Sequence, residues 1–541
     1  MKTRIIKSLL FLIMTTLFLF SKSSIWAQSS SSSSNLKPPE VIDENELFGG
    51  PKDIVTVIDP NVASAGTVQL VEDTKTYPVF LISGSAGAGL YGNYTPLGGS
   101  SSDKQTLYGA VDISDLEFDY LPAKNLHFSL STNLLAVPNQ ILAASATAYA
   151  DLRQSDLVRL YVSGSFNYDP SSYLSTNKEY ESPTLSLDEL FVDTHIEETL
   201  FFRLGKQRIS WGVGNWFKPS DVLSLSAIDP DDPTAAREGP FAFKVDVPMK
   251  LNHLMVYIVP PISENNAASS SAASKYDLVV NGWELSFGAY ARADMLARPR
   301  AIFSFTGAIG SFDVYGENVL LYGSDRIYAR ESSTPGTYEA YSIENKPFFQ
   351  STLGVKYSKS YSGGLSYSIH VQGYYNGMGY ADSSIMQNAA ATAAITEAIE
   401  DDYPTAYRYS DSSTDAGMWY LAGSASVSGR FGEGNSLTRV TGSVYALANF
   451  SDGSLRFNPQ LKVQVGDEGG KVSFTVSDLT SIGDVGSEYA KNGNITTPAL
   501  TVSLLNSEVS LQASVPINLN ADYSVKKLQT KFSIFWNAIE F

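Results

Sequence analysis

Cysteine, positive charge and long apolar runs are scarce in this sequence. Its 541 residues include no cysteine, which excludes disulfides and a lipid-modified N-terminus of the lipoprotein kind. The formal net charge of -18 at pH 7 argues against nucleic acid as a partner. Beyond the N-terminal segment, no apolar run reaches the roughly 20 residues that a membrane-spanning helix requires. We therefore expect neither a helical membrane protein nor a nucleic-acid-binding protein.

The N-terminal segment has the three-part layout of a secretory signal. Basic side chains lie among its first residues, residues 9–20 are almost wholly apolar, and residues 21–27 offer small side chains to a signal peptidase. An apolar core of about a dozen residues is too short to serve as a membrane anchor. The segment 1–27 is therefore predicted to be a signal peptide that is cleaved after Ala27.

The next segment, residues 28–75, differs in composition from the rest of the chain. It opens with a serine tract at 29–34, which is typical of a flexible leader, and it contains Pro38, Pro39, Pro51 and Pro60. We interpret it as an N-terminal periplasmic or plug segment. A disordered tether fits the same composition equally well.

From about residue 76 the apolar side chains recur with a period of two. Such a period places one set of residues on each face of a strand, whereas a helix would scatter both sets around its circumference. The clearest run alternates apolar with polar or small residues as Trp283, Leu285, Phe287, Ala289 and Ala291 against Glu284, Ser286, Gly288, Tyr290, Arg292 and Asp294. Similar runs occupy residues 126–134, 158–168 and 365–375.

The length and polarity of these runs favour a transmembrane barrel over a soluble sandwich. They extend for about ten residues, enough for a tilted strand to cross a bilayer, whereas sandwich strands are usually nearer five or six. The near-zero mean hydropathy of -0.07 fits strands with one lipid-facing and one wet face. Residues 76–541 are therefore predicted to form an all-β antiparallel transmembrane barrel of about 16 strands, in a range of about 14 to 18.

The connections predicted between these strands come in two lengths. Short turns are expected on the periplasmic side and long loops on the extracellular side. The short turns include residues 121–125 and 197–199. The long loops are expected at 215–240, 260–277, 324–346, 379–416 and 484–497, and the alanine-rich stretch 388–400 is a candidate short helix.

The candidate lumen and selectivity residues gather in one hairpin. If the chain turns at residue 198, antiparallel pairing sets Asp193 opposite Arg203 and Glu189 opposite Gln207. Opposed charges across strands are stabilising, and ionisable groups in a barrel wall are tolerated when they face inward. The predicted lumen set is Glu189, Asp193, His195, Arg203, Gln207 and Trp211, with Arg292 and Asp294 from a later strand.

Leu190, Val192, Ile196, Phe202 and Leu204 would then face lipid. Lys206 and Arg208 share the parity of this lipid-facing set, so their facing is left open. Either a bulge near Gly205 rotates the strand, or both residues lie beyond the hydrocarbon zone.

The stretch that follows carries a resemblance to known proteins. Leu204-Gly205-Lys206-Gln207, Ser210-Trp211-Gly212, Asn215, Phe217, Pro219 and Asp221-Val222-Leu223 resemble a signature of large porin-like outer-membrane barrels of Gram-negative bacteria and spirochaetes, including proteins related to alginate-export channels. The likeness is dense over about twenty residues and implies a monomeric channel of about 16 to 18 strands. It implies no substrate, and the scattered basic residues do not form the ladder expected of a polyanion exporter.

Enzymatic and metal-dependent functions are not predicted. The only histidines are His127, His195, His253 and His370, and the pair Asp193 and His195 has no recognisable nucleophile beside it. Residues 229–233 (Asp-Pro-Asp-Asp-Pro) lack the glycine and the closing glutamate of a calcium-binding EF-hand loop. No cofactor and no metal site are expected.

The last strand resembles the terminal signal that the barrel-assembly machinery recognises. Phe535, Ile539 and Phe541 share one parity, and the chain ends on an aromatic residue. An exposed apolar strand edge can be captured by strand addition before the barrel closes. The expected partners are thus the assembly machinery and the lipid of a bacterial outer membrane.

The function that these patterns favour is an outer-membrane channel for small solutes, with selectivity set by inward charges and a folded-in loop. Two alternatives remain open. One is a plugged transporter of hydrophobic compounds with a lateral wall opening, for which residues 35–75 would form the hatch. The other is a surface-exposed adhesin-type barrel that acts through its long loops.

Overall fold

The chain is described by a computed structural model. The described residues are 79–81, 85–97, 106–116, 126–137, 140–153, 155, 157–168, 184–226, 228–235, 237–261, 270–294, 297–402, 415–432, 437–466, 471–504, 509–520 and 523–537. The expected signal peptide, the segment 28–75, the turn at 121–125, and Ile539 and Phe541 lie outside them.

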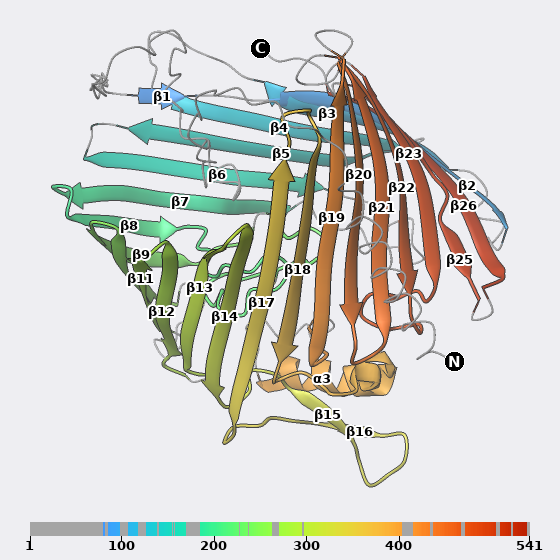
Figure 1. Cartoon of the computed structure of the whole chain (residues 1–541). Coiled ribbons are helices and arrows are strands. Elements are labelled where there is room, and N and C mark those ends of the chain that lie inside the picture. Colours follow the sequence, from blue (N-terminus) through green and yellow to red (C-terminus); the bar gives the residue numbers. More distant parts are fainter. Residues whose placement is uncertain are drawn as a thin grey trace, which may run out of the picture. The chain divides into compact units, whose positions relative to one another are not determined.

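Most of the described residues belong to strands of a single 24-stranded sheet. Its first half contains β1 (Val79–Leu81), β2 (Ser85–Leu97), β3 (Thr106–Leu116), β4 (Leu126–Val137), β5 (Gln140–Arg153), β6 (Val158–Tyr168), β7 (Thr184–Ile196), β8 (Leu200–Lys206), β9 (Phe241–Met249), β10 (Asn252–Val259), β11 (Ser271–Val280), β12 (Trp283–Arg292), β13 (Arg300–Ile309) and β14 (Phe312–Tyr322). From β2 to β14, consecutive strands pair antiparallel and lie side by side, whereas β1 pairs with β5 (Figure 1).

The second half of the sheet continues in the same way. It contains β17 (Pro347–Ser360), β18 (Ser366–Asn376), β19 (Trp419–Phe431), β20 (Thr438–Asn449), β21 (Ser454–Val465), β22 (Val472–Ile482), β23 (Ile495–Leu504), β24 (Val509–Ser514), β25 (Ile517–Leu519) and β26 (Val525–Asn537). The strands β15 (Tyr328–Glu331) and β16 (Tyr338–Tyr341) form a separate hairpin.

The strand number exceeds the predicted range of about 14 to 18, so that part of the prediction was wrong. The period of two does not reveal short hairpin turns that lack the usual glycine or proline. At Lys250 the backbone adopts a positive φ of 63° without a glycine, and Leu251 completes a two-residue turn between β9 and β10. With no turn residue as a marker, two strands look like one long run.

The predicted boundaries hold for some elements and fail for others. The run 158–168 is β6, and the alanine-rich stretch forms the helix α3 (Ala389–Asp402), preceded by the short 3-10 helix η4 (Ser383–Gln387). The predicted loop at 260–277 is shorter, because β11 begins at Ser271. The predicted loop at 324–346 contains the β15–β16 hairpin, and α3 packs against that hairpin (Figure 1).

The two faces of the sheet differ in chemistry. One face, the covered face, carries Asp193, Arg203, Glu317 and Gln372, and residues 207–240 pack on its β14 and β18 part. The opposite face, the exposed face, presents apolar side chains to the surroundings. Its exposed members are Leu190, Val192, Ile196, Leu204, Val256, Ile258, Phe287, Leu320, Phe349, Leu353, Val371, Leu421, Val444, Leu461, Val476 and Leu500. This is the apolar set that the period of two predicts.

Candidate functional site

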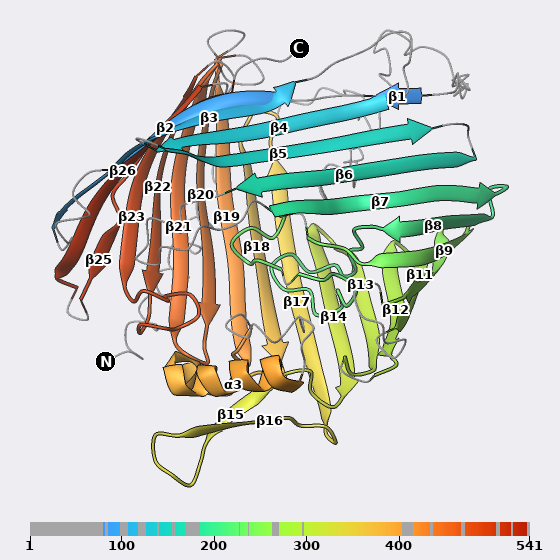
Figure 2. The ribbon, with the colours of Figure 1, turned by 180° about the vertical axis from the view of Figure 1, so that it is seen from behind.

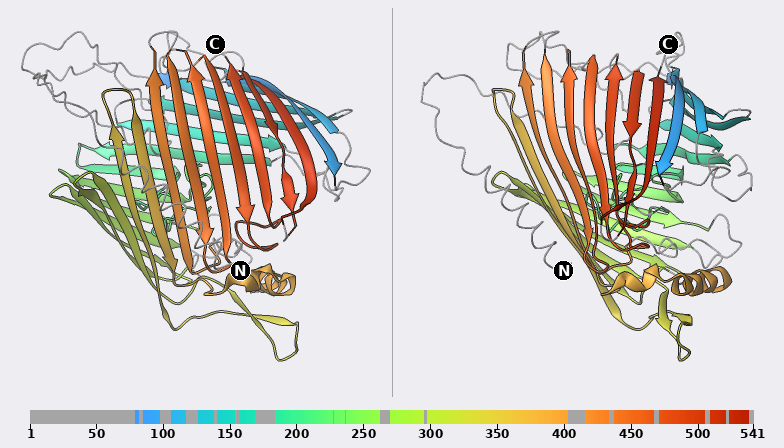
Figure 3. Two further views of the ribbon diagram at one scale, coloured as in Figure 1. Left: turned by 45° about the vertical axis from the view of Figure 1, so that its right-hand side comes forward. Right: turned by 90° about the vertical axis from the view of Figure 1, so that its right-hand side faces the viewer.

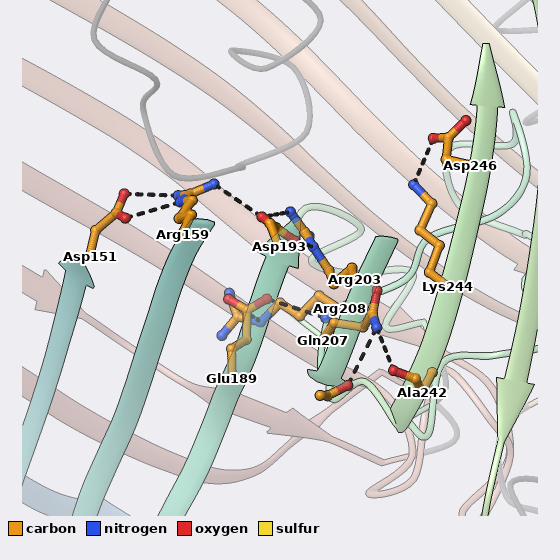
Figure 4. A network of polar contacts seen from close by, with 11 residues as sticks. Asp151, Arg159, Glu189, Asp193, Arg203, Gln207, Arg208, Ala242, Lys244 and Asp246 are labelled. Carbon is orange, nitrogen blue, oxygen red and sulfur yellow. Dashed lines mark hydrogen bonds and ion pairs between the residues drawn. The ribbon is translucent and has the colours of Figure 1, made fainter. Parts of the chain in front are cut away.

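A row of ion pairs crosses the covered face at one level of β5 to β8 (Figure 4). Arg159 contacts both carboxylate oxygens of Asp151, at 3.0 and 2.9 Å, and lies 3.8 Å from Asp193. Arg203 donates to both oxygens of Asp193, at 2.6 and 2.9 Å. Asp193 is the direct cross-strand partner of Arg203, so this predicted pair is confirmed. The other predicted pair, Glu189 and Gln207, lies beyond the last paired residues of β7 and β8.

The row continues on the next strands. Lys244 of β9 is the cross-strand partner of Arg203 and pairs with Asp246 at 3.0 Å. On β11, Lys275 pairs with Asp277 at 3.0 Å. Four acids and four bases line this wall, so their charges cancel, although the two bases Arg203 and Lys244 are neighbours. We call the row from Asp151 to Asp277 the charge ladder.

Aromatic rings hold the ladder guanidinium groups in place. Arg203 lies over the ring of Phe191 at 3.9 Å, and Arg159 lies 5.8 Å from the same ring. Phe191 in turn stacks on Tyr161 at 5.1 Å. A guanidinium over an aromatic face gains cation–π attraction, and a bidentate carboxylate fixes its plane. These contacts keep the charges at defined positions on the wall.

The remaining predicted residues of the hairpin have other partners. Gln207 is buried and donates through Nε2 to the Ala242 carbonyl at 3.0 Å. Glu189 is buried and accepts from the Arg208 backbone N–H at 3.2 Å. Trp211 is buried against Tyr257, edge to face. All three fasten the start of the 207–240 segment.

The structure also places Lys206 and Arg208. The pairing of β7 with β8 is regular through Leu190 and Lys206, so no bulge rotates the strand. The strand ends there, and the Lys206 ammonium meets Glu238 of the returning chain at 2.7 Å. The Arg208 guanidinium lies 4.0 Å from Glu189.

Three predicted site residues lie apart from the charge ladder. His195 contacts the Glu197 carbonyl through Nδ1 at 2.6 Å and stacks on Phe201, while Asp193 engages arginines. The two side chains therefore show no acid–base pairing with one another. Arg292 and Asp294 form a bidentate pair of their own at the end of β12, with contacts from 2.8 to 3.0 Å.

A buried glutamate of β14 holds the 207–240 segment to the sheet. Glu317 is fully buried and accepts from the Gly214 N–H at 2.5 Å, the Ser220 N–H at 3.0 Å and the Ser220 hydroxyl at 2.6 Å. Gly212 has a φ of +97°, and a Cβ there would lie 2.6 Å from the Glu317 carboxylate. Only glycine allows so close an approach in that conformation, which explains the Trp-Gly pair of the motif.

A buried glutamine of β18 makes a second attachment to this segment. Figure 2 shows the segment as the green coil that joins β8 to β9. The side-chain oxygen of Gln372 accepts from the N–H groups of Asn215 and Trp216 at 3.0 and 2.9 Å, and its nitrogen donates to the Phe217 carbonyl at 2.7 Å. All of its polar atoms thus bind loop backbone, which replaces the pairing that a strand would offer. Trp216 also lies on His370, with ring centroids 4.5 Å apart.

Side chains of the segment complete this attachment. Phe217 packs on Tyr374 and Tyr420 at 5.0 and 5.4 Å. Asp221 accepts from the Trp211 N–H and forms an ion pair with Arg237. The motif Trp211 to Leu223 therefore folds one long loop against strands far from it in sequence.

The charges within the segment influence one another. Burial lowers the pKa of Lys218, and the neighbouring Arg237 lowers it further, whereas Asp221 and Glu317 act in the opposite direction. The segment is also joined to the wall beyond β20: Asp231 pairs with Arg456 of β21 and accepts from the Tyr445 hydroxyl at 3.0 Å.

The sequence patterns did not single out Glu317, Gln372 or the ladder members Arg159 and Lys244 as site residues. Each has the parity of the wet face, which is the only local signal that marks them. Among the described residues no group of three His, Asp or Glu side chains is arranged to hold a metal ion. In the same part of the chain, no helix has the length and apolarity to cross a membrane.

Comparisons with known proteins give structural likeness alone. No protein-family model matches the chain, and no curated protein sequence matches it. OccAB1 of Acinetobacter baumannii superposes with a TM-score of 0.41 at 11% identity over 85% of this chain and 97% of the other. The outer membrane protein OprD of Pseudomonas aeruginosa gives 0.36 at 7% identity, over 85% and 95%.

Wzi of Escherichia coli, an outer membrane protein involved in group 1 capsule assembly and a carbohydrate-binding β-barrel, gives a TM-score of 0.31 at 10% identity. That match covers 84% of this chain and 85% of Wzi. At such values the likeness assigns no function to this chain.

Proposed function

We propose that the chain is an outer-membrane channel for small solutes, built as a closed β-barrel in which the covered face lines the lumen. The observation that carries the proposal is the division between the faces. Charged pairs gather on the covered face, while the exposed face presents Leu, Val, Ile and Phe. An apolar surface of this extent is costly in water, at about 25 cal/mol per Å², and is stable against lipid.

The strand pairing supports closure. β26 pairs with β24 and β25 on one side and with β2 on the other. A sheet whose last strand is bonded to an early strand has no free edge there, and a membrane-spanning sheet needs all its backbone groups paired. In this proposal the signal peptide 1–27 delivers the chain, and the assembly machinery inserts it by recognising the C-terminal residues that end in Phe541.

The 207–240 segment is proposed to narrow the lumen as a fixed wall. Glu317 and Gln372 together make six hydrogen bonds to it, three each. A loop held this way does not swing freely, because each buried bond that opens leaves an unsatisfied group at about 1 to 3 kcal/mol. Solutes would pass beside this segment, along the charge ladder of β5 to β11.

Single-channel recording of the refolded full chain in a planar bilayer tests the proposal. We expect discrete conductance steps, with weak ion preference because the ladder charges nearly cancel. A variant in which residues 213–236 are replaced by a short glycine–serine linker should conduct more. Absence of conductance in both proteins would contradict an open channel and favour the plugged or adhesin-type alternatives.

A further inference from the structure

Three prolines lie at one level of neighbouring strands in the second half of the sheet. Pro459 is in β21, Pro498 in β23, and Pro516 separates β24 from β25. The register sets Asp478 of β22 opposite Pro498, and the Val515 N–H donates to the Pro498 carbonyl at 2.9 Å. Figure 3 shows these strands, orange to red, side by side.

Proline is rare inside a sheet because it has no N–H to donate. Here three inter-strand donors are lost at a single level. Pairing between β21 and β22 lapses there: it runs up to Phe457 with Thr480 and resumes at Gln460 with Ser477. On the other side of β23, the ladder with β24 stops at Ala499 and Ser514 and the ladder with β25 begins at Thr496 and Ile517, with the Val515–Pro498 hydrogen bond between them. Fewer inter-strand hydrogen bonds therefore cross the wall along this line, which we call the proline row.

The polarity of β22 inverts at the same level. Below it, Phe474 and Val476 are exposed on the apolar face, and Ser473 and Ser477 alternate with them on the covered face. At the proline row the order reverses, because Asp478 takes the apolar-face position. Leu479 takes the covered-face position and is exposed there.

Polar groups gather around Asp478 on the outer side. Its carboxylate accepts from the Thr496 hydroxyl at 2.7 Å, from the Thr497 N–H at 3.1 Å and from the Thr480 hydroxyl at 3.3 Å. Thr480 and Thr496 also bond to each other at 2.9 Å. A negative charge is thereby held on a face that elsewhere carries apolar side chains.

We propose that the proline row is a lateral port through which an amphipathic molecule with an alkyl chain and an amine head group passes between the lumen and the surrounding lipid. The alkyl chain would pass beside Leu479, where the pairing of β21 with β22 is interrupted. The amine would bind the Asp478 carboxylate and the hydroxyls of Thr480 and Thr496. This inference rests on the proposed barrel. It does not require that the barrel conduct ions.

Photocross-linking to lipid tests the port. Benzoylphenylalanine is placed at Leu479, and the refolded chain is inserted into vesicles of phosphatidylethanolamine, which carries an amine, or of phosphatidylglycerol, which does not. We expect lipid adducts at Leu479, more with phosphatidylethanolamine. Asp478→Asn should reduce that preference roughly two- to fivefold, the factor expected for one surface ion pair. Dodecylamine added from solution, with its own adduct mass, shows whether the port also takes soluble amphiphiles.

Two sets of controls distinguish a port from a residue that merely lies near lipid. One set varies the position of the cross-linker, and the other locks neighbouring strands with a disulfide. Val476 on the exposed face should cross-link strongly, and Ser477 on the covered face should not. A disulfide between Gln460→Cys and Ser477→Cys, the cross-strand pair beside the row, should suppress the Leu479 adducts. The matched disulfide between Val463→Cys and Phe474→Cys, away from the row, should leave them unchanged.

Two results would overturn the port: Leu479 adducts no more frequent than those at Ser477, or adducts that survive the lock beside the row. Ion conductance of the same variants is read separately. Loss of conductance with unchanged Leu479 adducts would contradict the proposed channel but not the proposed port.

Discussion

Glu317 and Gln372 achieve the same end through different chemistry. The carboxylate accepts three hydrogen bonds, and the amide accepts two and donates one, so each matches the backbone groups that the loop offers. Buried donors must find acceptors, and a single side chain on a rigid strand supplies several. The position of the loop is thus decided by two residues of the wall.

Removal of the glutamate should free the loop. Glu317→Ala leaves the Gly214 and Ser220 N–H groups without their acceptor, at a cost of about 1 to 3 kcal/mol for each. We expect rapid current flicker and faster chymotryptic cleavage after Phe217. Glu339→Gln, on the exposed β16 position that pairs with Arg330, is the control. An unchanged current trace for Glu317→Ala would show that the loop is held without the carboxylate.

Asp193 should set the sign of ion selectivity. It balances Arg203 and Arg159, so Asp193→Asn leaves extra positive charge on the wall. The anion-to-cation permeability ratio should rise on the order of twofold, because one charge among several changes. Reversal potentials in a salt gradient measure it.

The double variant Asp193→Ala with Arg203→Ala removes one charge of each sign and should return the ratio toward that of the natural chain. If Asp193→Asn leaves the ratio unchanged, the charge ladder does not line the ion path.

At the scale of elements, the loop between β22 and β23 is fastened by one acid. Glu488 accepts from the Asp415 N–H at 2.8 Å, the Tyr420 hydroxyl at 2.8 Å and the Asn449 amide at 2.9 Å. Burial raises the pKa of Glu488 to about 8, and the nearby Asp415 and Asp452 carboxylates raise it as well. The loop attachment is therefore sensitive to pH.

The direction of this pH dependence follows from the linkage between proton binding and folding. Because the folded-state pKa lies above the ordinary carboxyl pKa of 4.5, the stabilising contribution is complete below pH 4.5 and is lost as pH rises through about 8. Amide hydrogen exchange in residues 483–494, corrected for the intrinsic pH dependence, should accelerate between about pH 5 and 9. Glu488→Gln should flatten this profile; an identical profile would assign the pH dependence to another group.

Elements differ in how far the sequence predicts them. The strand 158–168 and the helix 389–402 follow from local periodicity, and the Asp193–Arg203 register follows from one recognisable turn. The hairpin around Lys250 escapes prediction because its turn has no marker residue. The Glu317 attachment escapes for a different reason, since Gly214 and Glu317 are 103 residues apart and no local pattern joins them.

At the scale of the whole molecule, the prediction concerns assembly. In the proposed route the C-terminal residues are recognised by their apolar parity before the barrel closes, and Phe541 is the last of them. Deletion of Phe541 should lower the amount of folded protein in the outer membrane without reducing export to the periplasm. Heat-modifiable gel mobility measures folding, and periplasmic fractionation measures export.

Phe541→Tyr keeps an aromatic terminus and is the matched control for that deletion. Equal assembly of the deleted and the natural chain would show that the assembly machinery does not recognise the terminal residue. Reduced export, in contrast, would place the defect before insertion.

The sequence by itself determined that the described part of the chain consists mainly of strands with an apolar and a polar face, because a period of two needs only neighbouring residues. It also located the hairpin of Asp193 and Arg203. The tertiary structure alone decided the number of strands, the attachment of the 207–240 segment and the alignment of the three prolines. These depend on register between strands distant in sequence, where packing and hydrogen-bond satisfaction select one arrangement among many.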